Sequence, residues 1–153
     1  PTLTDADSLT GGDLETVHTT IRHGIRTADD DSRQSDMPKF GQEQLLEKAQ
    51  INDVAEYALS LSGAATDQEA VGRGAEIFAE QCSACHGENG AGNTELGAPN
   101  LANGIWLYGG DKKDVVQSIH TGRGGVMPPW HTRLDDVTLK QLAVYVHSLG
   151  GGQ

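Results

Sequence analysis

The chain has 153 residues and is strongly acidic, with 11 Lys and Arg against 22 Asp and Glu and a formal net charge of −11. Its length allows one domain or two small ones. Phosphate groups would be repelled by this charge, so the composition argues against a nucleic-acid-binding protein. The sequence shows no signal peptide, membrane span or initiator Met.

Two segments within the first 61 residues have apolar residues at helical spacing. Val17 and Ile21 mark the first, and Ile51, Val54, Ala58 and Leu61 mark the second. This spacing predicts two amphipathic helices.

Polar residues lie on and after the first of these helices. We expect His18 and His23 to be surface residues rather than metal ligands. Adjacent carboxylates in a polar run need no ligand, so Asp29-Asp30-Asp31 is expected to be a solvated loop rather than a metal site.

Three further helices are predicted after a linker at residues 62–69. They are marked by Val71, Ala75, Phe78 and Cys82, by Val115 and Ile119, and by Leu139, Leu142, Val146 and Leu149. The sequence therefore predicts an all-α fold. Because three short helices with long loops bury little apolar surface, we expect a bound group to complete the core.

The only two cysteines of the chain lie in Cys82-Ser83-Ala84-Cys85-His86. Their spacing is that by which a haem is attached through two thioethers, and the following His is placed to ligate the iron. A zinc site would need two further Cys or His ligands, a redox dithiol would need βαβ patterning, and a disulfide would leave His86 without a role. The motif therefore predicts one covalent haem c, attached at Cys82 and Cys85 and ligated by His86.

A thioether sulfur is the usual partner of His in a six-coordinate electron carrier, and the chain has two methionines, Met37 and Met127. Met127 follows two glycines, which allow close backbone approach, and precedes two prolines, which stiffen the loop. A lone Met is more often core filler, but this loop chemistry favours Met127 as an iron ligand. Pro99 either directs its carbonyl to His86 Nδ1 or simply forms a turn.

Residues 67–153 resemble a class I cytochrome c domain, in which the first helix crosses the last. Gly74 and Phe78 match that first helix, Tyr145 matches the aromatic residue of the last helix, and Met127 matches the sulfur ligand. The fold implied is a class I cytochrome c fold around a covalent haem.

More narrowly, the chain resembles the dihaem subunit III (CcoP) of cbb3-type cytochrome c oxidases. The segments that carry this resemblance are residues 82–87, 97–101, 106–110 and 122–128. It implies that Trp106, Tyr108 and Arg123 line the haem and help to hold its propionates. Without it, they would be ordinary aromatic core and a solvated arginine.

An internal repeat indicates tandem domains. Residues 1–13 align without gaps on residues 99–111. Further pairs are Val17, Ile21 and Gly24 with Val115, Ile119 and Gly122, Met37 with Met127, and Ile51, Val54, Tyr57 and Leu61 with Leu139, Leu142, Tyr145 and Leu149. The sequence thus predicts a partial cytochrome c repeat at residues 1–66 and a complete cytochrome c domain at residues 67–153.

The first repeat begins at the equivalent of Pro99, so it lacks a first helix and a haem motif. Ser8 and Thr10 stand where the second repeat has Trp106 and Tyr108. The missing helix and motif suggest a trimmed piece of a longer subunit. Ser8 and Thr10 fit deliberate removal of aromatic residues that trimming would expose, natural drift or uncertain residue assignment. Because its helices lack a partner, we expect them to pack on the complete domain or on a second copy, giving a homodimer through residues 1–61.

The resemblance implies a periplasmic single-electron carrier at the outer face of the inner membrane, with no substrate chemistry of its own. A soluble cytochrome or copper protein would donate electrons, other oxidase subunits would accept them, and anchor helices absent from this chain would attach it to the membrane. The alternatives are another periplasmic cytochrome, c4-like or of the nitric oxide reductase type, and a haem enzyme or gas sensor of peroxidase type. The last would need an open axial position.

Overall fold

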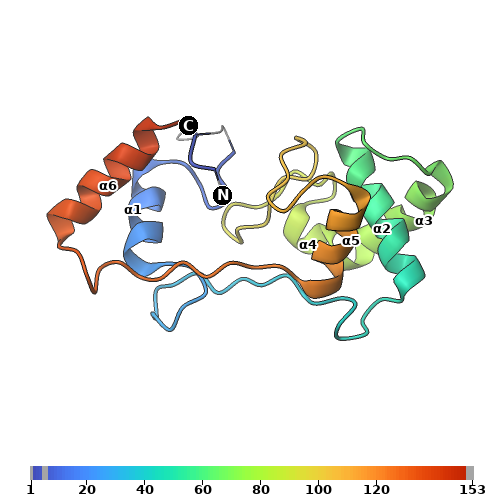
Figure 1. Ribbon diagram of the computed structural model, residues 1–153, viewed down its shortest axis with the longest axis horizontal. Coiled ribbons are helices and arrows are strands. Elements are labelled where there is room, and N and C mark those ends of the chain that lie inside the picture. The colour runs from blue at the N-terminus through green and yellow to red at the C-terminus, as the bar shows by residue number, and fades with distance from the viewer. Residues whose placement is uncertain (1, 5–6, 151–153) are drawn as a thin grey trace. The chain divides into compact units, whose positions relative to one another are not determined.

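The fold comes from a computed structural model that describes residues 2–4 and 7–150. Pro1, Asp5, Ala6 and residues 151–153, which belong to the predicted repeat and domains, lie outside the described residues. The part described is helical, with isolated β-bridges and no strand, which confirms the all-α prediction for it. The helices are α1 (Leu14–His23), α2 (Lys48–Leu61), α3 (Gln68–Gln81), α4 (Ser83–His86), α5 (Lys112–Thr121) and α6 (Asp136–Ser148) (Figure 1).

Aspartate side chains cap the N-termini of α1, α3 and α6. Asp13 accepts a hydrogen bond from the Thr16 N–H at 3.0 Å, and Asp135 accepts one from the Thr138 N–H at 2.8 Å. Asp67 accepts two hydrogen bonds, from the backbone N–H groups of Glu69 and Ala70 in the first turn of α3. These N–H groups have no acceptor within their own helix, so the caps define where the helices begin.

The chain forms two compact units. Unit 1 comprises residues 1–35, 94–97 and 125–153, and unit 2 comprises residues 36–93 and 98–124. Unit 1 contains α1 and α6, and unit 2 contains α2 to α5. Each unit therefore combines segments of both predicted repeats. The predicted boundary between the two repeats, at residue 66, lies in the loop between α2 and α3. It stays a prediction.

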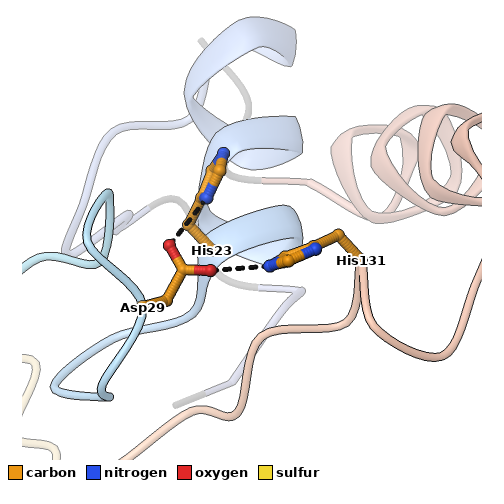
Figure 2. Close-up of side chains that lie close together, drawn as sticks. All are labelled: His23, Asp29 and His131. Carbon is orange, nitrogen blue, oxygen red and sulfur yellow. Dashed lines mark hydrogen bonds and ion pairs between the residues drawn. The ribbon is translucent and has the colours of Figure 1, made fainter.

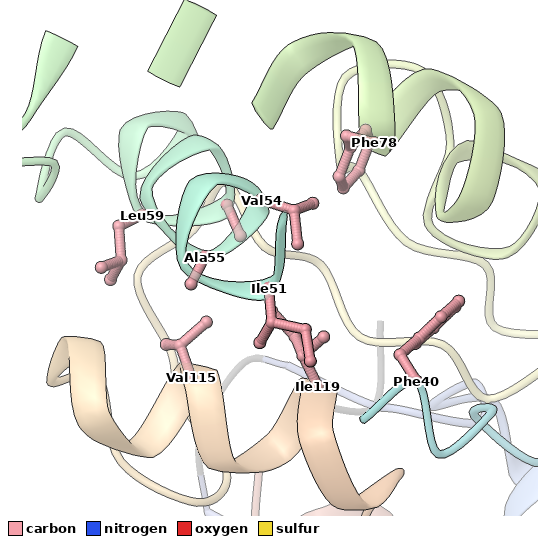
Figure 3. Packing of buried hydrophobic residues seen from close by; sticks show 9 residues of the cluster. Phe40, Ile51, Val54, Ala55, Leu59, Phe78, Val115 and Ile119 are labelled. Atoms are coloured by element: carbon pink, nitrogen blue, oxygen red, sulfur yellow. The ribbon is translucent and has the colours of Figure 1, made fainter. Parts of the chain in front are cut away.

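The core of unit 2 lies between α2, α3 and α5 (Figure 3). Its buried residues are Phe40, Ile51, Val54, Ala55, Ala58, Leu59, Phe78, Val115 and Ile119. Each large apolar side chain that is fully buried contributes about 1.5–3 kcal/mol to stability. The predicted amphipathic segment around Ile51 thus has its apolar face covered within this chain.

Gly74 lies where α3 packs tightly against α2. A Cβ atom at Gly74 would lie 2.1 Å from the carbonyl oxygen of Asp53, so only glycine fits there. Beside it, the Arg73 guanidinium donates two hydrogen bonds of 2.8 Å to the Asp53 carboxylate. The rings of Tyr57 and Phe78 follow, with centroids 4.9 Å apart. The helix that crosses α3 in unit 2 is therefore α2.

A buried carboxylate connects α2 to α5. Glu56 is 0% exposed, and Lys112 Nζ donates to its Oε1 at 2.8 Å. The N–H and hydroxyl of Thr66 donate to the same carboxylate at 2.9 and 3.0 Å. The hydrogen bond from Lys112 is the main reason that the pKa of Glu56 falls to about 2. A buried charge is tolerated here because it is paired and fully hydrogen-bonded.

In unit 1, α1 packs on α6. The buried residues are Ile21, Leu139 and Ala143, and Met127 and Trp130 are among the partly buried residues against them. Arg22 on α1 forms an ion pair with Asp136 on α6. The backbone of Met127 exchanges two hydrogen bonds with that of Ile25, at 2.9 and 3.0 Å.

Among the helices described, none is long and apolar enough to cross a membrane.

Candidate haem site

The cysteine motif lies where α3 ends and α4 begins, in unit 2. The N–H groups of Cys85 and His86 both donate to the carbonyl of Cys82, at 3.2 and 3.0 Å. The chain therefore makes one helical turn across the motif, which brings both thiols and the imidazole into one short segment. Both cysteines are free; Cys82 is half-buried and Cys85 is exposed.

Cys82 also packs against the apolar core of unit 2. Burial, with a smaller effect from Cys85, raises the pKa of its thiol to about 11. Cys82 is therefore a neutral thiol at neutral pH rather than a reactive thiolate. A pair of thiols of which one is held protonated is poorly suited to disulfide exchange, and this agrees with an attachment role.

His86 is oriented by the backbone of the loop that follows the motif. Its Nδ1 lies 3.0 Å from the carbonyl oxygen of Pro99, so Nδ1 carries the proton and Nε2 keeps a free lone pair. Burial lowers the pKa of His86, which also favours the neutral ring. The expected contact with Pro99 is thus present, and it leaves Nε2 available to a metal.

The loop containing Trp106 and Tyr108 is also in unit 2. Trp106 packs against the apolar core, and a Cβ atom at Gly110 would lie 2.6 Å from its ring. Tyr108 is exposed; the Arg123 guanidinium lies 5.2 Å from the centroid of its ring and donates to its carbonyl at 3.4 Å. Their predicted role at haem propionates stays a prediction.

The two methionines lie in different units. Met127 belongs to unit 1, where it packs with Ile21 and Leu139. Met37 belongs to unit 2, where it packs against the same apolar core as Cys82. Unit 2 therefore contains the haem motif together with the methionine of the predicted first repeat.

A second group of ligand-type side chains lies in unit 1 (Figure 2). Asp29 Oδ1 is 2.9 Å from His23 Nδ1, and Asp29 Oδ2 is 2.6 Å from His131 Nε2. The hydrogen bond with His131, followed by that with His23, lowers the pKa of Asp29. The prediction of a solvated Asp29 is therefore wrong, because its side chain is only 13% exposed and bridges two imidazoles.

His18 and His23, expected to be surface residues rather than metal ligands, are both partly exposed and partly buried. His23 is half-buried against Asp29, and His18 Nε2 is buried without a hydrogen-bond partner. Sequence spacing could not reveal the cluster, since His131 lies 102 positions after Asp29.

Two free thiols and an oriented imidazole on one helical turn, in a unit of packed helices, define the c-type cytochrome class. The family model described as "Cytochrome C oxidase, cbb3-type, subunit III" matches residues 69–146. The chain belongs to this family.

Curated relatives agree over the whole chain. It is 58% identical to the cbb3-type cytochrome c oxidase subunit FixP of Azorhizobium caulinodans, 51% identical to subunit CcoP of Cereibacter sphaeroides and 47% identical to subunit CcoP of Rhodobacter capsulatus. Each similarity covers 100% of this chain but only 52%, 53% and 54% of the respective relative. The chain thus spans about half the length of these proteins.

Proposed function

We propose that the chain carries single electrons on one haem c bound by unit 2. Cys82 and Cys85 would hold the porphyrin through thioethers, and His86 Nε2 would ligate the iron. The observation that carries the proposal is the hydrogen bond of 3.0 Å between His86 Nδ1 and the Pro99 carbonyl, because it supports a neutral imidazole with a free Nε2 beside two free thiols. When bound, the haem supplies an iron that changes its charge by one electron.

The residues of the chain would tune this exchange in three ways. The Pro99 carbonyl fixes the ring plane of His86 and increases its basicity as a ligand. Trp106 and Cys82 both pack against the unit 2 core, which would keep water away from that side of the haem. A methionine sulfur would complete the coordination and raise the reduction potential, and the sequence predicts Met127 for this role. Tyr108 and Arg123 would contact the propionates.

The family and its named relatives support a setting in a cbb3-type oxidase. In this setting the haem would lie on the periplasmic side of the inner membrane. It would receive electrons from a soluble cytochrome or copper protein and pass them to other subunits of the oxidase. The homodimer through residues 1–61 stays a prediction. The apolar face of α2, which was expected to seek a partner, is covered by α3 and α5.

Carbon monoxide binding separates a carrier from a haem enzyme or gas sensor. With both axial positions filled, the reduced holoprotein should bind carbon monoxide slowly and incompletely while exchanging electrons rapidly with small redox proteins. The double variant Met37→Ala with Met127→Ala is the positive control, because removal of both sulfurs opens the axial position. Rapid stoichiometric binding by the unaltered protein would contradict the carrier proposal.

A further inference from the structure

Three side chains of unit 1 bring metal-ligating atoms together (Figure 2). They are His23, Asp29 and His131, and one ligand atom from each lies within 4.8 Å of the other two. The two imidazole rings are tilted by 44° with centroids 5.6 Å apart, so both can face one ion from different directions. Two imidazoles with a carboxylate form a ligand set that proteins use for zinc and for other divalent transition metals.

The backbone holds His131 beside the end of α1. The N–H of His131 donates to the carbonyl of Arg22 at 3.3 Å, and the N–H of Trp130 donates to the carbonyl of Ile21 at 3.2 Å. Both carbonyls belong to the last turn of α1, where the helix itself provides no donor. His23 is the last residue of α1. Main-chain contacts therefore bring the two imidazoles together, independently of any contact between their side chains.

Hydrogen bonds also brace the loop that contains Asp29. The N–H of Asp29 donates to Thr27 Oγ1 at 3.2 Å, and that hydroxyl donates to the carbonyl of His23 at 3.3 Å. The N–H of Thr27 donates to Ser32 Oγ at 3.2 Å, and the N–H of Asp31 donates to Asp29 Oδ1 at 3.0 Å. Because the carboxylate is already oriented, it would lose little conformational freedom on binding an ion.

The charges around the group favour a cation. Asp31 Oδ2 lies 3.7 Å from His23 Nδ1, and the Asp31 side chain is 78% exposed, so it can supply a further ligand from the solvent side. The last carbonyls of α1 add partial negative charge. Arg22, in the same turn, is paired with Asp136 on α6. A divalent ion at this place would be attracted by two carboxylates and by the helix end.

An ion would replace the protons that the carboxylate now shares with the two rings. Asp29 lies 2.9 Å from His23 Nδ1 and 2.6 Å from His131 Nε2, which are hydrogen-bond distances. Ligand atoms around tetrahedral zinc are about 3.3 Å apart, so small side-chain rotations would open the group. Each imidazole would then carry its proton on its other nitrogen and present a lone pair to the ion.

From this geometry we propose that His23, Asp29 and His131 bind one divalent transition-metal ion of the zinc type, with Asp31 or water as the fourth ligand. Calcium and magnesium prefer oxygen ligands, so the two imidazoles argue against them. The ion would join segments of unit 1 that are 102 residues apart and stabilise the packing of α1 on α6. The proposal does not involve the haem. It replaces the expectation from the sequence that His23 and the Asp29 loop bind no metal.

Calorimetric titration of the holoprotein with zinc chloride, in buffer with excess magnesium, tests the proposal. In the holoprotein Cys82 and Cys85 would be thioethers, which cannot compete as thiolates. The unaltered protein should bind one zinc ion per chain in its tightest step. Asp29→Asn and His131→Gln should each weaken that step at least about tenfold, because even residues that only orient metal ligands contribute this much. His147→Gln, in the last turn of α6, is the matched control and should leave the affinity unchanged.

Thermal unfolding gives a second readout. Because an ion that binds only the folded protein stabilises it, zinc should raise the unfolding temperature of the unaltered protein and of His147→Gln, but not that of Asp29→Asn. In NMR spectra of the unaltered protein, zinc should shift the imidazole signals of His23 and His131 and leave those of His147 in place. This measurement locates the ion without any substitution.

Three results would overturn the proposal. The first is an unaltered protein that binds no zinc, in which case the group is a hydrogen-bonded cluster only. The second is an affinity that neither Asp29→Asn nor His131→Gln changes, because the zinc would then bind elsewhere. The third is a zinc-induced shift confined to other histidines.

Discussion

At the scale of single residues, charge placement is the most specific information in this chain. Glu56 has no exposed surface, yet it is ionised because Lys112, Thr66 and the N–H of Asp67 all donate to it. His86 is held in one tautomer by a single backbone carbonyl. Asp29 bridges two imidazoles. None of these partners is adjacent in sequence. The sequence predicted the haem motif and offered the contact between His86 and Pro99, but it could not predict the contacts of Glu56 and Asp29.

Replacing Glu56 by Gln should lower the free energy of unfolding by about 2 kcal/mol at neutral pH, because a buried ion pair is lost. The folded pKa of Glu56 is about 2 against an ordinary value of 4.5. A lowered pKa contributes stability that is complete above the unfolded value and disappears as the pH falls toward the folded one. The difference between unaltered protein and variant should therefore shrink between about pH 4.5 and pH 2.

Urea unfolding of the holoprotein at a series of pH values measures this difference. Glu80→Gln, at an exposed position of α3, is the control and should change stability by less than about 0.5 kcal/mol. A difference for Glu56→Gln that does not vary with pH would contradict the assignment of an ionised, paired Glu56.

At the scale of helices, periodicity predicted the elements well and their pairing poorly. The apolar residues expected in helices lie in α1, α2, α3, α5 and α6, apart from Cys82 and Leu149 at the ends of α3 and α6. The partner of each helix could not be predicted, because α2 and α6 have the same apolar spacing and both have a tyrosine at the crossing position. The helix that pairs with α3 is determined by single differences between α2 and α6, such as Asp53 in α2 where α6 has Gln141. This difference matters because Arg73 of α3 donates two hydrogen bonds to Asp53, and the sequence does not show that contact.

Two glycines of α3 provide a matched test of the crossing with α2. A Cβ atom at Gly74 would lie 2.1 Å from Asp53 O, so Gly74→Ala must separate the helices and should lower the free energy of unfolding by about 2 kcal/mol. Gly72 has no atom within 4 Å of its Cβ position, and Gly72→Ala should raise stability by up to about 1 kcal/mol. Thermal unfolding followed by circular dichroism compares them. Equal effects would show that α3 is not packed tightly on α2.

At the scale of the whole molecule, acidic charge and a haem motif occur together in a chain of the cbb3-type subunit III family. The negative charge is spread over both predicted repeats, with five Lys and Arg against twelve Asp and Glu in residues 1–66 and six against ten in residues 67–153. Such a surface would attract basic electron-transfer partners and accelerate their association at low ionic strength. The proposed function of this chain nevertheless depends on a haem at unit 2.

The most direct test of that central claim is the intact mass of the chain after production in cells that attach haem c. The account predicts a mass increase of one haem that survives denaturation, because thioethers to Cys82 and Cys85 are covalent. Cys82→Ala with Cys85→Ala should have the mass of the polypeptide alone. An unaltered chain without covalent haem, or one that carries two, would contradict the account.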